Sequence, residues 1–115
     1  YFVEQMKINK LFVIKLDNIV CGAMLLKEED KEYWNNDDCS YYIHHLVTDS
    51  NLKGIGKKLI EFAKGQCKEN DKKYLRLDCY KESVFLNKYY KNLGFHNVGN
   101  GTKGDYHYNL WEMKI

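Results

Sequence analysis

Apolar residues along this chain fall into short runs, each followed by polar or glycine-containing segments, and these runs predict strands. Two apolar, β-branched runs at 10–16 and 19–26 are separated by Asp17 and Asn18, a pair typical of a two-residue hairpin turn. A third run at 40–47 is rich in aromatic and β-branched residues, which favour strands. The first half of the chain is therefore predicted to form at least three strands.

The spacing of apolar residues changes after residue 54 and predicts two helices. From Ile55 they recur on one helical face as far as about Asn70, with lysines and glutamates on the other face. Ser83 is a suitable N-cap for a second helix, which Gly94 would close at the position after its C-cap, with Phe95 packing behind it. Both helices are amphipathic and are expected to cover a sheet.

The remaining segments complete the predicted order of elements. Residues 73–80 read as a short strand, and 95–98 and 106–115 as a terminal hairpin around a loop at 99–105. Apolar positions in residues 1–9 lie close to helical spacing and predict the end of a helix. A strand-helix-strand crossover favours parallel pairing in the middle, whereas hairpins are antiparallel. The predicted fold is α/β (α+β), a mixed and mostly antiparallel sheet flanked by helices.

Composition and charge narrow the class of protein. With 115 residues the chain suits one domain over 1–115, and 44% hydrophobic with 30% charged residues indicates a globular protein. The net charge of +2 disfavours nucleic acid or membrane as partners, and no apolar run approaches the length of a membrane span. Four scattered cysteines without a CxxC pair predict neither disulfides nor a metal site. A cytoplasmic location is expected.

Two glycines at the start of the first predicted helix form the main candidate site. Gly54 and Gly56 follow a strand and open a helix, where free N–H groups and the positive end of the dipole attract anions. Lys53, Lys57 and Lys58 add positive charge beside them. The glycines alone leave two readings open, a pyrophosphate-binding turn and a plain turn from strand to helix.

Two other phosphate-binding motifs are excluded by residue type. A P-loop requires Ser or Thr after its lysine, but Lys58 follows Lys57 here. A dinucleotide fingerprint requires a third glycine three residues after Gly56, and that position is Leu59. Any phosphate bound at this turn would be held in another way.

Two longer segments resemble the GNAT superfamily of acyl-CoA-dependent N-acyltransferases. Residues 43–63, "IHHLVTDSNLKGIGKKLIEFA", contain a variant of its [RQ]-x-x-G-x-[GA] turn, with Asn51 at the Arg/Gln position and a loop about two residues shorter than usual. Residues 74–95 end in "LNKYYKNLGF", similar to the family's second motif, with Ser83 where many members have Asn. The resemblance covers Leu11 to Ile115. It implies a domain lacking the family's first strand and first helix.

The resemblance implies that acetyl-CoA is the cosubstrate and that the chain transfers its acetyl group to a primary amine by direct attack. In this family the two central parallel strands splay apart and pantetheine fills the gap. The Val47 backbone N–H would then polarise the thioester carbonyl. The residues implied to bind acetyl-CoA are Leu46, Val47, Thr48, Asn51, Lys53, Gly54, Ile55, Gly56, Lys57, Lys58, Ser83, Asn87 and Tyr90.

Tyr90, four residues before Gly94 in the second motif, is the candidate acid that protonates the thiolate leaving group. A lysine-like amine must also lose a proton, which costs about 4.6 kcal/mol at pH 7. His45 is the candidate base, with His44 as an alternative; strand alternation predicts that they face opposite sides. Asp78 and Glu82 are weaker candidates, and packing is the competing role for Tyr90.

Aromatic and acidic residues between the predicted strand at 19–26 and the start of the one at 40–47 could line a pocket for a cationic acceptor. They are Tyr33, Trp34, Asp37, Asp38, Tyr41 and Tyr42. Tyr108 and Trp111 on the last strand are assigned to the core or to a homodimer edge.

The alternative to an enzyme is a non-catalytic acyl-CoA-binding regulatory module of the same fold. A partner protein of nucleic acid is disfavoured because no broad basic face is predicted.

Overall fold

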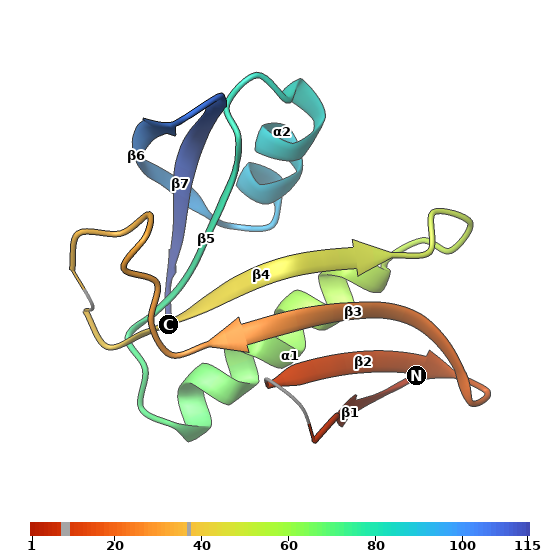
Figure 1. Ribbon diagram of the computed structural model, residues 1–115. Coiled ribbons are helices and arrows are strands. Elements are labelled where there is room, and N and C mark those ends of the chain that lie inside the picture. Colours follow the sequence, from red (N-terminus) through yellow and green to blue (C-terminus); the bar gives the residue numbers. More distant parts are fainter. Residues whose placement is uncertain (8–9, 37) are drawn as a thin grey trace.

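The described residues form one seven-stranded sheet and two helices (Figure 1). The computed structural model describes residues 1–7, 10–36 and 38–115. The strands lie in the order β1-β2-β3-β4-β5-β7-β6 across the sheet. In chain order the elements are β1 (Phe2–Gln5), β2 (Leu11–Leu16), β3 (Ile19–Lys27), β4 (Ser40–Thr48), α1 (Ile55–Glu69), β5 (Tyr74–Tyr80), α2 (Val84–Asn92), β6 (His96–Lys103) and β7 (Tyr106–Lys114).

The mixed, mostly antiparallel sheet confirms the predicted fold class. Strand β4 pairs with β5 in parallel, and the other neighbouring strands of the described sheet pair antiparallel. The parallel register covers only Ser40, Tyr41 and Tyr42 on β4, opposite 74–76 on β5. Beyond these residues the two strands diverge, and Figure 1 shows a wedge opening between them. This wedge is the central feature of the fold.

Local sequence signals explain the turns and helix ends. Asp17 and Asn18 have φ of 52° and 65°, the left-handed conformation of a tight hairpin turn, as predicted. The Ser83 hydroxyl accepts a hydrogen bond from the Leu86 N–H at 3.2 Å and caps α2. Gly94 follows α2 with φ 106°, a conformation that side chains disfavour. These three predictions are confirmed.

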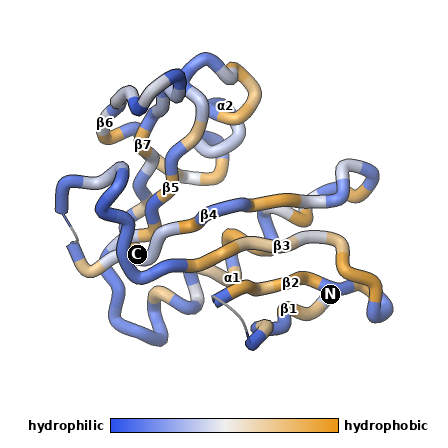
Figure 2. Tube along the Cα trace, in the orientation of Figure 1, coloured by the Kyte–Doolittle hydropathy of each residue, from blue (hydrophilic) through white to orange (hydrophobic). Residues whose placement is uncertain are grey.

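The core lies between the sheet and the apolar face of α1. The helix buries the predicted face, and Phe62 packs against it at the margin. Figure 2 shows mainly apolar colouring along β2 and in the interior parts of α1, whereas the connection between β3 and β4 is polar. Neither helix is long and apolar enough to cross a membrane in the part of the chain that the structure describes. The fully buried α1 residues are Ile55, Leu59, Ile60, Ala63 and Cys67.

The predicted helix at residues 1–9 is wrong where the structure describes it. Phe2–Gln5 forms the edge strand β1, which pairs antiparallel with β2 from Phe2–Lys15 to Gln5–Phe12. The few apolar positions in this short segment cannot distinguish helical spacing from chance. Pairing with the exposed edge of β2 supplies the segment with backbone hydrogen bonds. Ile8 and Asn9 lie outside the described residues.

The terminal hairpin is confirmed, but its loop is shorter than predicted. Strand β6 continues through the glycine-rich segment to Lys103, and only Gly104 and Asp105 separate it from β7. Gly101 lies opposite Tyr108, and a Cβ on Gly101 would come within 2.4 Å of the tyrosine hydroxyl. The glycine therefore provides space for a cross-strand aromatic ring, which a reading based on turn propensity did not detect.

Candidate active site

The N-terminus of α1 presents free backbone donors at the wide end of the wedge. Gly54 caps the helix with φ 81°, and a Cβ there would meet no atom within 4 Å. The Lys58 N–H bonds the Gly54 carbonyl at 3.1 Å, so the N–H groups of residues 55–57 have no partner within the helix. The first turn carries no acidic residue. This end of α1 can therefore accept an anion.

A cavity of about 220 Å³ lies between this helix end, β4 and α2. We call it the glycine-turn cavity. It brings together six of the residues predicted to bind acetyl-CoA: Leu46, Thr48, Gly54, Ile55, Gly56 and Tyr90. Leu52, Phe85, Leu86 and Tyr89 also line it, and the sequence analysis missed them. Their helical spacing on α2 could have shown that 85, 86, 89 and 90 share one side of that helix.

The polar residues predicted beside the glycines lie around this cavity rather than in it. Lys53, Lys57, Lys58 and Asn51 are exposed. Lys57 and Lys58 line a separate hollow with Tyr1, and the Lys58 ammonium lies 4.7 Å from the centre of the Tyr1 ring. The Asn51 N–H donates to the Asp49 carboxylate at 2.9 Å. The side chain of Val47 is also exposed.

Asn87 and Ser83 are engaged within the protein. The Asn87 amide nitrogen donates to three carbonyls, those of Tyr80, Lys81 and Ser83, at 2.9, 3.2 and 2.7 Å. Its oxygen accepts from Cys79, Asn109 and Trp111. Asn87 thus joins the turn between β5 and α2 to strand β7. Trp111 is buried, as its assignment to the core predicted.

Tyr90 connects the glycine-turn cavity to a second one. Its side chain is 8% exposed and, together with Leu46, it lines both cavities. Burial raises the pKa of Tyr90, and nearby Cys79, Tyr89 and Asp78 raise it further. The hydroxyl therefore keeps its proton at neutral and mildly alkaline pH and is available as a donor.

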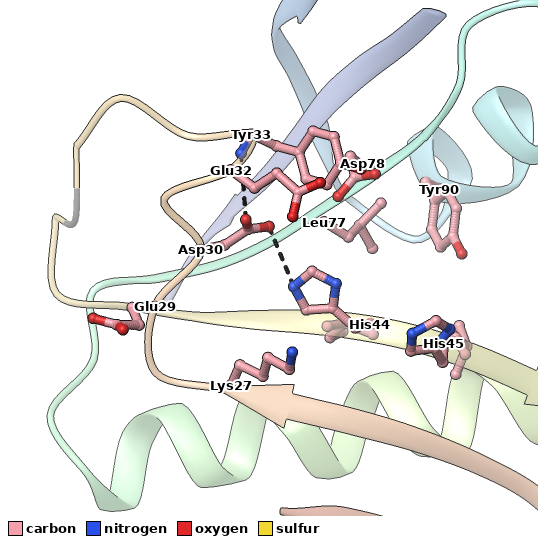
Figure 3. A pocket seen from close by; sticks show the side chains of 12 residues that line it. Lys27, Glu29, Asp30, Glu32, Tyr33, His44, His45, Leu77, Asp78 and Tyr90 are labelled. Atoms are coloured by element: carbon pink, nitrogen blue, oxygen red, sulfur yellow. Dashed lines mark hydrogen bonds and ion pairs between the residues drawn. The ribbon is translucent and has the colours of Figure 1, made fainter. Parts of the chain in front are cut away.

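The second cavity, of about 400 Å³, is lined by carboxylates and histidines (Figure 3). We call it the acidic cavity. Its carboxylates are Glu29, Asp30, Glu32 and Asp78, and Lys27 is its lysine. In Figure 3 Asp30 and Tyr33 lie toward one end of the cavity, while Tyr90 and His45 lie toward the other. A cavity of this size can hold a small molecule.

Asp30, His44 and Asp78 form a compact cluster in this cavity. One ligand atom from each lies within 4.8 Å of those of the other two. Asp30 Oδ2 is 3.2 Å from His44 Nε2, an ion-pair distance without the angle of a hydrogen bond. The Tyr33 N–H donates to Asp30 Oδ1 at 3.3 Å, and the Tyr106 hydroxyl donates to Asp78 Oδ2 at 2.6 Å. Hydrogen bonds thus hold both aspartates in place, while Asp30 Oδ2 and His44 Nε2 form none with the described residues.

The two aspartates of the cluster differ in their pKa. For Asp30, desolvation raises the pKa, but the contact with His44 and the backbone N–H groups of Tyr33 and Glu32 outweigh it and lower the pKa overall. For Asp78, burial raises the pKa more than the Tyr106 hydroxyl lowers it. Asp30 is therefore the more firmly ionised carboxylate at neutral pH.

Strand alternation predicted that His44 and His45 face opposite sides of the sheet. This prediction is wrong, because both residues line the acidic cavity. The register between β3 and β4 shifts at this point, because Leu25 pairs with His44 and Ala23 with Val47. One extra residue on β4 is thus accommodated as a bulge, where His45 has φ 52°. The bulge turns two successive side chains toward one cavity.

The comparisons with known proteins agree with this geometry. Residues 2–115 match the family model described as "Acetyltransferase (GNAT) domain". The chain belongs to the GNAT acetyltransferase family. It is 27% identical over 113 residues to the Bacillus subtilis (strain 168) protein named "Uncharacterized N-acetyltransferase YesJ", covering 91% of this chain and 61% of the relative. The chain therefore spans about three fifths of the length of that relative.

Solved GNAT structures share the fold. An acetyltransferase from Listeria monocytogenes 4b F2365 superposes with a TM-score of 0.77 at 24% identity, over 91% of this chain and 64% of that one. A putative streptothricin acetyltransferase from Bacillus anthracis str. Ames, in complex with acetyl coenzyme A, gives 0.76 at 25% identity, over 91% and 61%. A GNAT protein from Elizabethkingia anophelis with acetyl-CoA bound gives 0.72 at 16%, over 92% and 76%. GNAT relatives of this structure thus bind acetyl-CoA.

The predicted aromatic pocket for a cationic acceptor is occupied, in this GNAT domain, by the protein's own arginine. Arg76 on β5 is 3% exposed, and its guanidinium carbon lies 4.5 Å from the centre of the Trp34 ring. It donates to the Glu112 carboxylate at 2.8 Å and to the Tyr42 hydroxyl at 3.0 Å. Asp38 also pairs with it, whereas Asp37 lies outside the described residues. Of this predicted group, Tyr33 reaches the acidic cavity.

Gly56 of the GNAT turn leaves space for the Tyr89 hydroxyl, which lies against its backbone. A Cβ on Gly56 would lie 2.0 Å from the Tyr89 hydroxyl oxygen. We expect Gly56→Ala to displace Tyr89 and lower the free energy of unfolding by about 1 kcal/mol, the clash outweighing the gain in helix propensity. In a Tyr89→Phe background, which lacks the hydroxyl, the same substitution should be neutral or stabilising. Urea denaturation of the four proteins in the cycle measures this. Equal effects in both backgrounds would contradict the pairing.

Proposed function

We propose that this chain transfers the acetyl group of acetyl-CoA to a primary amine, at the point where the glycine-turn cavity meets the acidic cavity. The observation that carries the proposal is that Leu46 and Tyr90 line both cavities. One cavity has the character of an anion site and the other that of a cation site. A reaction between two bound substrates requires such a junction.

The glycine-turn cavity fits the phosphate and pantetheine parts of acetyl-CoA. The α1 N-terminus offers unpaired N–H groups beside Gly54, where the backbone faces open space. The edge of β4 that faces β5 loses its strand partner after Tyr42, so backbone groups of residues 46–48 are available to an extended ligand. The relatives described above with acetyl-CoA bound support this assignment.

Acetyl-CoA supplies an activated thioester, and the described residues favour direct attack by the amine over an acyl-enzyme. A cysteine nucleophile would have to be a thiolate. Burial raises the pKa of Cys79 and of Cys67 to about 11, so both remain thiols at neutral pH. Cys21 is buried, and the Cys39 thiol, just before β4, donates to the Asp71 carbonyl at 3.4 Å. These thiols are poorly suited to carry an acetyl group.

Proton transfers at the junction are assigned to Tyr90 and His45. The Tyr90 hydroxyl keeps its proton because burial raises its pKa, and it can donate that proton to the departing thiolate. His44 and His45 both line the acidic cavity from β4, and His45 is assigned to accept the proton that the amine must lose. His45 lies toward the Tyr90 end in Figure 3, which makes it the nearer of the two to the junction. The Val47 N–H remains the proposed donor to the thioester carbonyl.

Calorimetry and a turnover assay test the proposal. Acetyl-CoA should bind with a dissociation constant in the micromolar range, and pantetheine should bind much more weakly because it lacks the phosphates. With a panel of primary amines, acetyl-CoA should be consumed and CoA thiol released. Binding without turnover of any amine would favour the alternative, a non-catalytic acyl-CoA-binding module. Absence of binding by a folded sample would overturn both.

A further inference from the structure

We propose that the Asp30–His44–Asp78 cluster binds a second positive charge of the acceptor, so that the preferred substrates are linear amines that carry another ammonium group. This inference rests on the proposed acetyl transfer and specifies its substrate class. It concerns the part of the acidic cavity around Asp30, which lies toward the opposite end from Tyr90 in Figure 3.

The charges around the acidic cavity are unbalanced in favour of a cation. Four carboxylates line it, against the ammonium of Lys27. Glu32 is neutralised by an ion pair with Lys103, and Glu29 pairs with Lys31. Asp30 is compensated only when His44 is protonated, and Asp78 receives a neutral hydroxyl from Tyr106 rather than a cation. A ligand with positive charge would therefore find uncompensated carboxylates at this end.

The cluster contains two polar atoms, Asp30 Oδ2 and His44 Nε2, that lie at ion-pair distance without a hydrogen bond. The Asp30 side chain is 5% exposed, and its Oδ2 lies 3.2 Å from His44 Nε2, but neither atom forms a hydrogen bond with the described residues. Leaving a buried carboxylate oxygen without a donor costs free energy. An ammonium has three N–H donors and no acceptor. It could satisfy Asp30 and Asp78 together, because their oxygens and His44 Nε2 lie within 4.8 Å of one another.

The bound cation is the distal ammonium rather than the reacting amine. Carboxylates beside an amine stabilise its charged form and raise its pKa, which would oppose the deprotonation that attack requires. The reacting amine is therefore better placed near Tyr90 and Leu46, where the two cavities meet. In Figure 3 Asp30 lies toward the opposite end from Tyr90. A linear molecule with amines at both ends would reach both positions.

An isosteric series of acceptors tests this on the unaltered protein. The probes are 1,5-diaminopentane, 5-aminopentan-1-ol and 5-aminopentanoate, which have a similar chain and place a cation, a neutral group or an anion at the far end. We expect kcat/KM for the diamine to exceed that for the amino alcohol by about 30-fold or more, beyond the factor of two for its two reactive ends. The amino acid should be the poorest acceptor. Equal values for the diamine and the amino alcohol would overturn the inference and leave the proposed acetyl transfer standing.

Isosteric variants locate the effect. Asp30→Asn and Asp78→Asn should each reduce the preference for the diamine at least tenfold, whereas Asp105→Asn, which removes the same charge from the exposed β6–β7 turn, should not change it. Thermal denaturation establishes that each variant folds. A diamine preference that survives in both cluster variants would overturn the assignment.

Two further outcomes distinguish this inference from its alternatives. If no amine is acetylated, the proposed function fails; calorimetry of the diamine against the amino alcohol then tests the subsite alone, and equal binding overturns it. Two carboxylates and a histidine could also hold a divalent metal. Micromolar binding of Zn²⁺ or Mn²⁺ that is lost in Asp30→Asn, without any diamine preference, would overturn the ammonium assignment.

Discussion

Replacement of Tyr90 by phenylalanine is expected to lower kcat for acetyl transfer by about 10²- to 10⁴-fold, the usual range for loss of a general acid. The fold should persist because the ring still packs against Phe95, whose centre lies 5.8 Å away. Binding of acetyl-CoA should change little, since the hydroxyl is assigned to the leaving group and not to the phosphates. Steady-state kinetics with the best amine and calorimetry with acetyl-CoA measure the two effects separately.

The neighbouring tyrosine supplies the matched control for this prediction. Tyr89→Phe removes a hydroxyl from the same cavity but not the proposed acid, so kcat should fall much less. The pH dependence gives a second check. Because burial raises the pKa of Tyr90 above its ordinary value of 10, its proton is not lost between pH 7 and 10, and this residue should cause no fall in rate over that interval. Unchanged kcat in Tyr90→Phe would leave Tyr90 with a packing role only.

The largest expected effect on stability comes from Arg76. Arg76→Ala should lower the free energy of unfolding by about 3–5 kcal/mol, because it removes one partner of a buried ion pair and leaves the Glu112 carboxylate unpaired. The guanidinium also donates to the Asn36 carbonyl at 3.0 Å and contacts Trp34, so the connection between β3 and β4 should lose its attachment to the sheet. Chemical denaturation and near-UV circular dichroism of the tryptophans measure both consequences.

Two comparisons separate the buried pair from a general charge effect. Lys31→Ala removes a cation from an exposed ion pair with Glu29 and should cost less than about 1 kcal/mol. The double variant Arg76→Met/Glu112→Gln should recover part of the stability lost in Arg76→Ala, because no unpaired charge remains in the sheet. If Arg76→Ala were no more destabilising than Lys31→Ala, the proposed role of Arg76 in holding this connection would be wrong.

The sequence predicted those parts of the fold that depend on local signals. The α1 face follows from apolar spacing over fifteen residues, and the hairpin at Asp17–Asn18 and the end of α2 at Gly94 follow from residues suited to left-handed backbone. The position of the glycine turn between a strand and a helix left two interpretations open, a pyrophosphate-binding turn and a plain turn. The family resemblance added the role proposed for Tyr90, which spacing alone could not distinguish from packing.

The remaining features depend on contacts between distant segments. Trp34 and Tyr42 were expected to attract a substrate cation, but Arg76, more than thirty residues along the chain, occupies that position. The faces of His44 and His45 were mispredicted because a bulge depends on the register with β3, which is not encoded locally. Asp30 lies in a polar connection where nothing in the sequence distinguishes it from its neighbours. Its significance follows only from its approach to His44.

The short parallel register between β4 and β5 has a consequence for the lifetime of the protein. Three paired positions join the half of the sheet formed by β1–β4 to the half formed by β5–β7. Local opening along so short a contact costs less than opening of the antiparallel pairs on either side. A ligand held in the wedge would close this boundary and shift the equilibrium toward the closed protein. Resistance to proteolysis would then rise and fall with the supply of acetyl-CoA, which would link turnover of the protein to that of its cosubstrate.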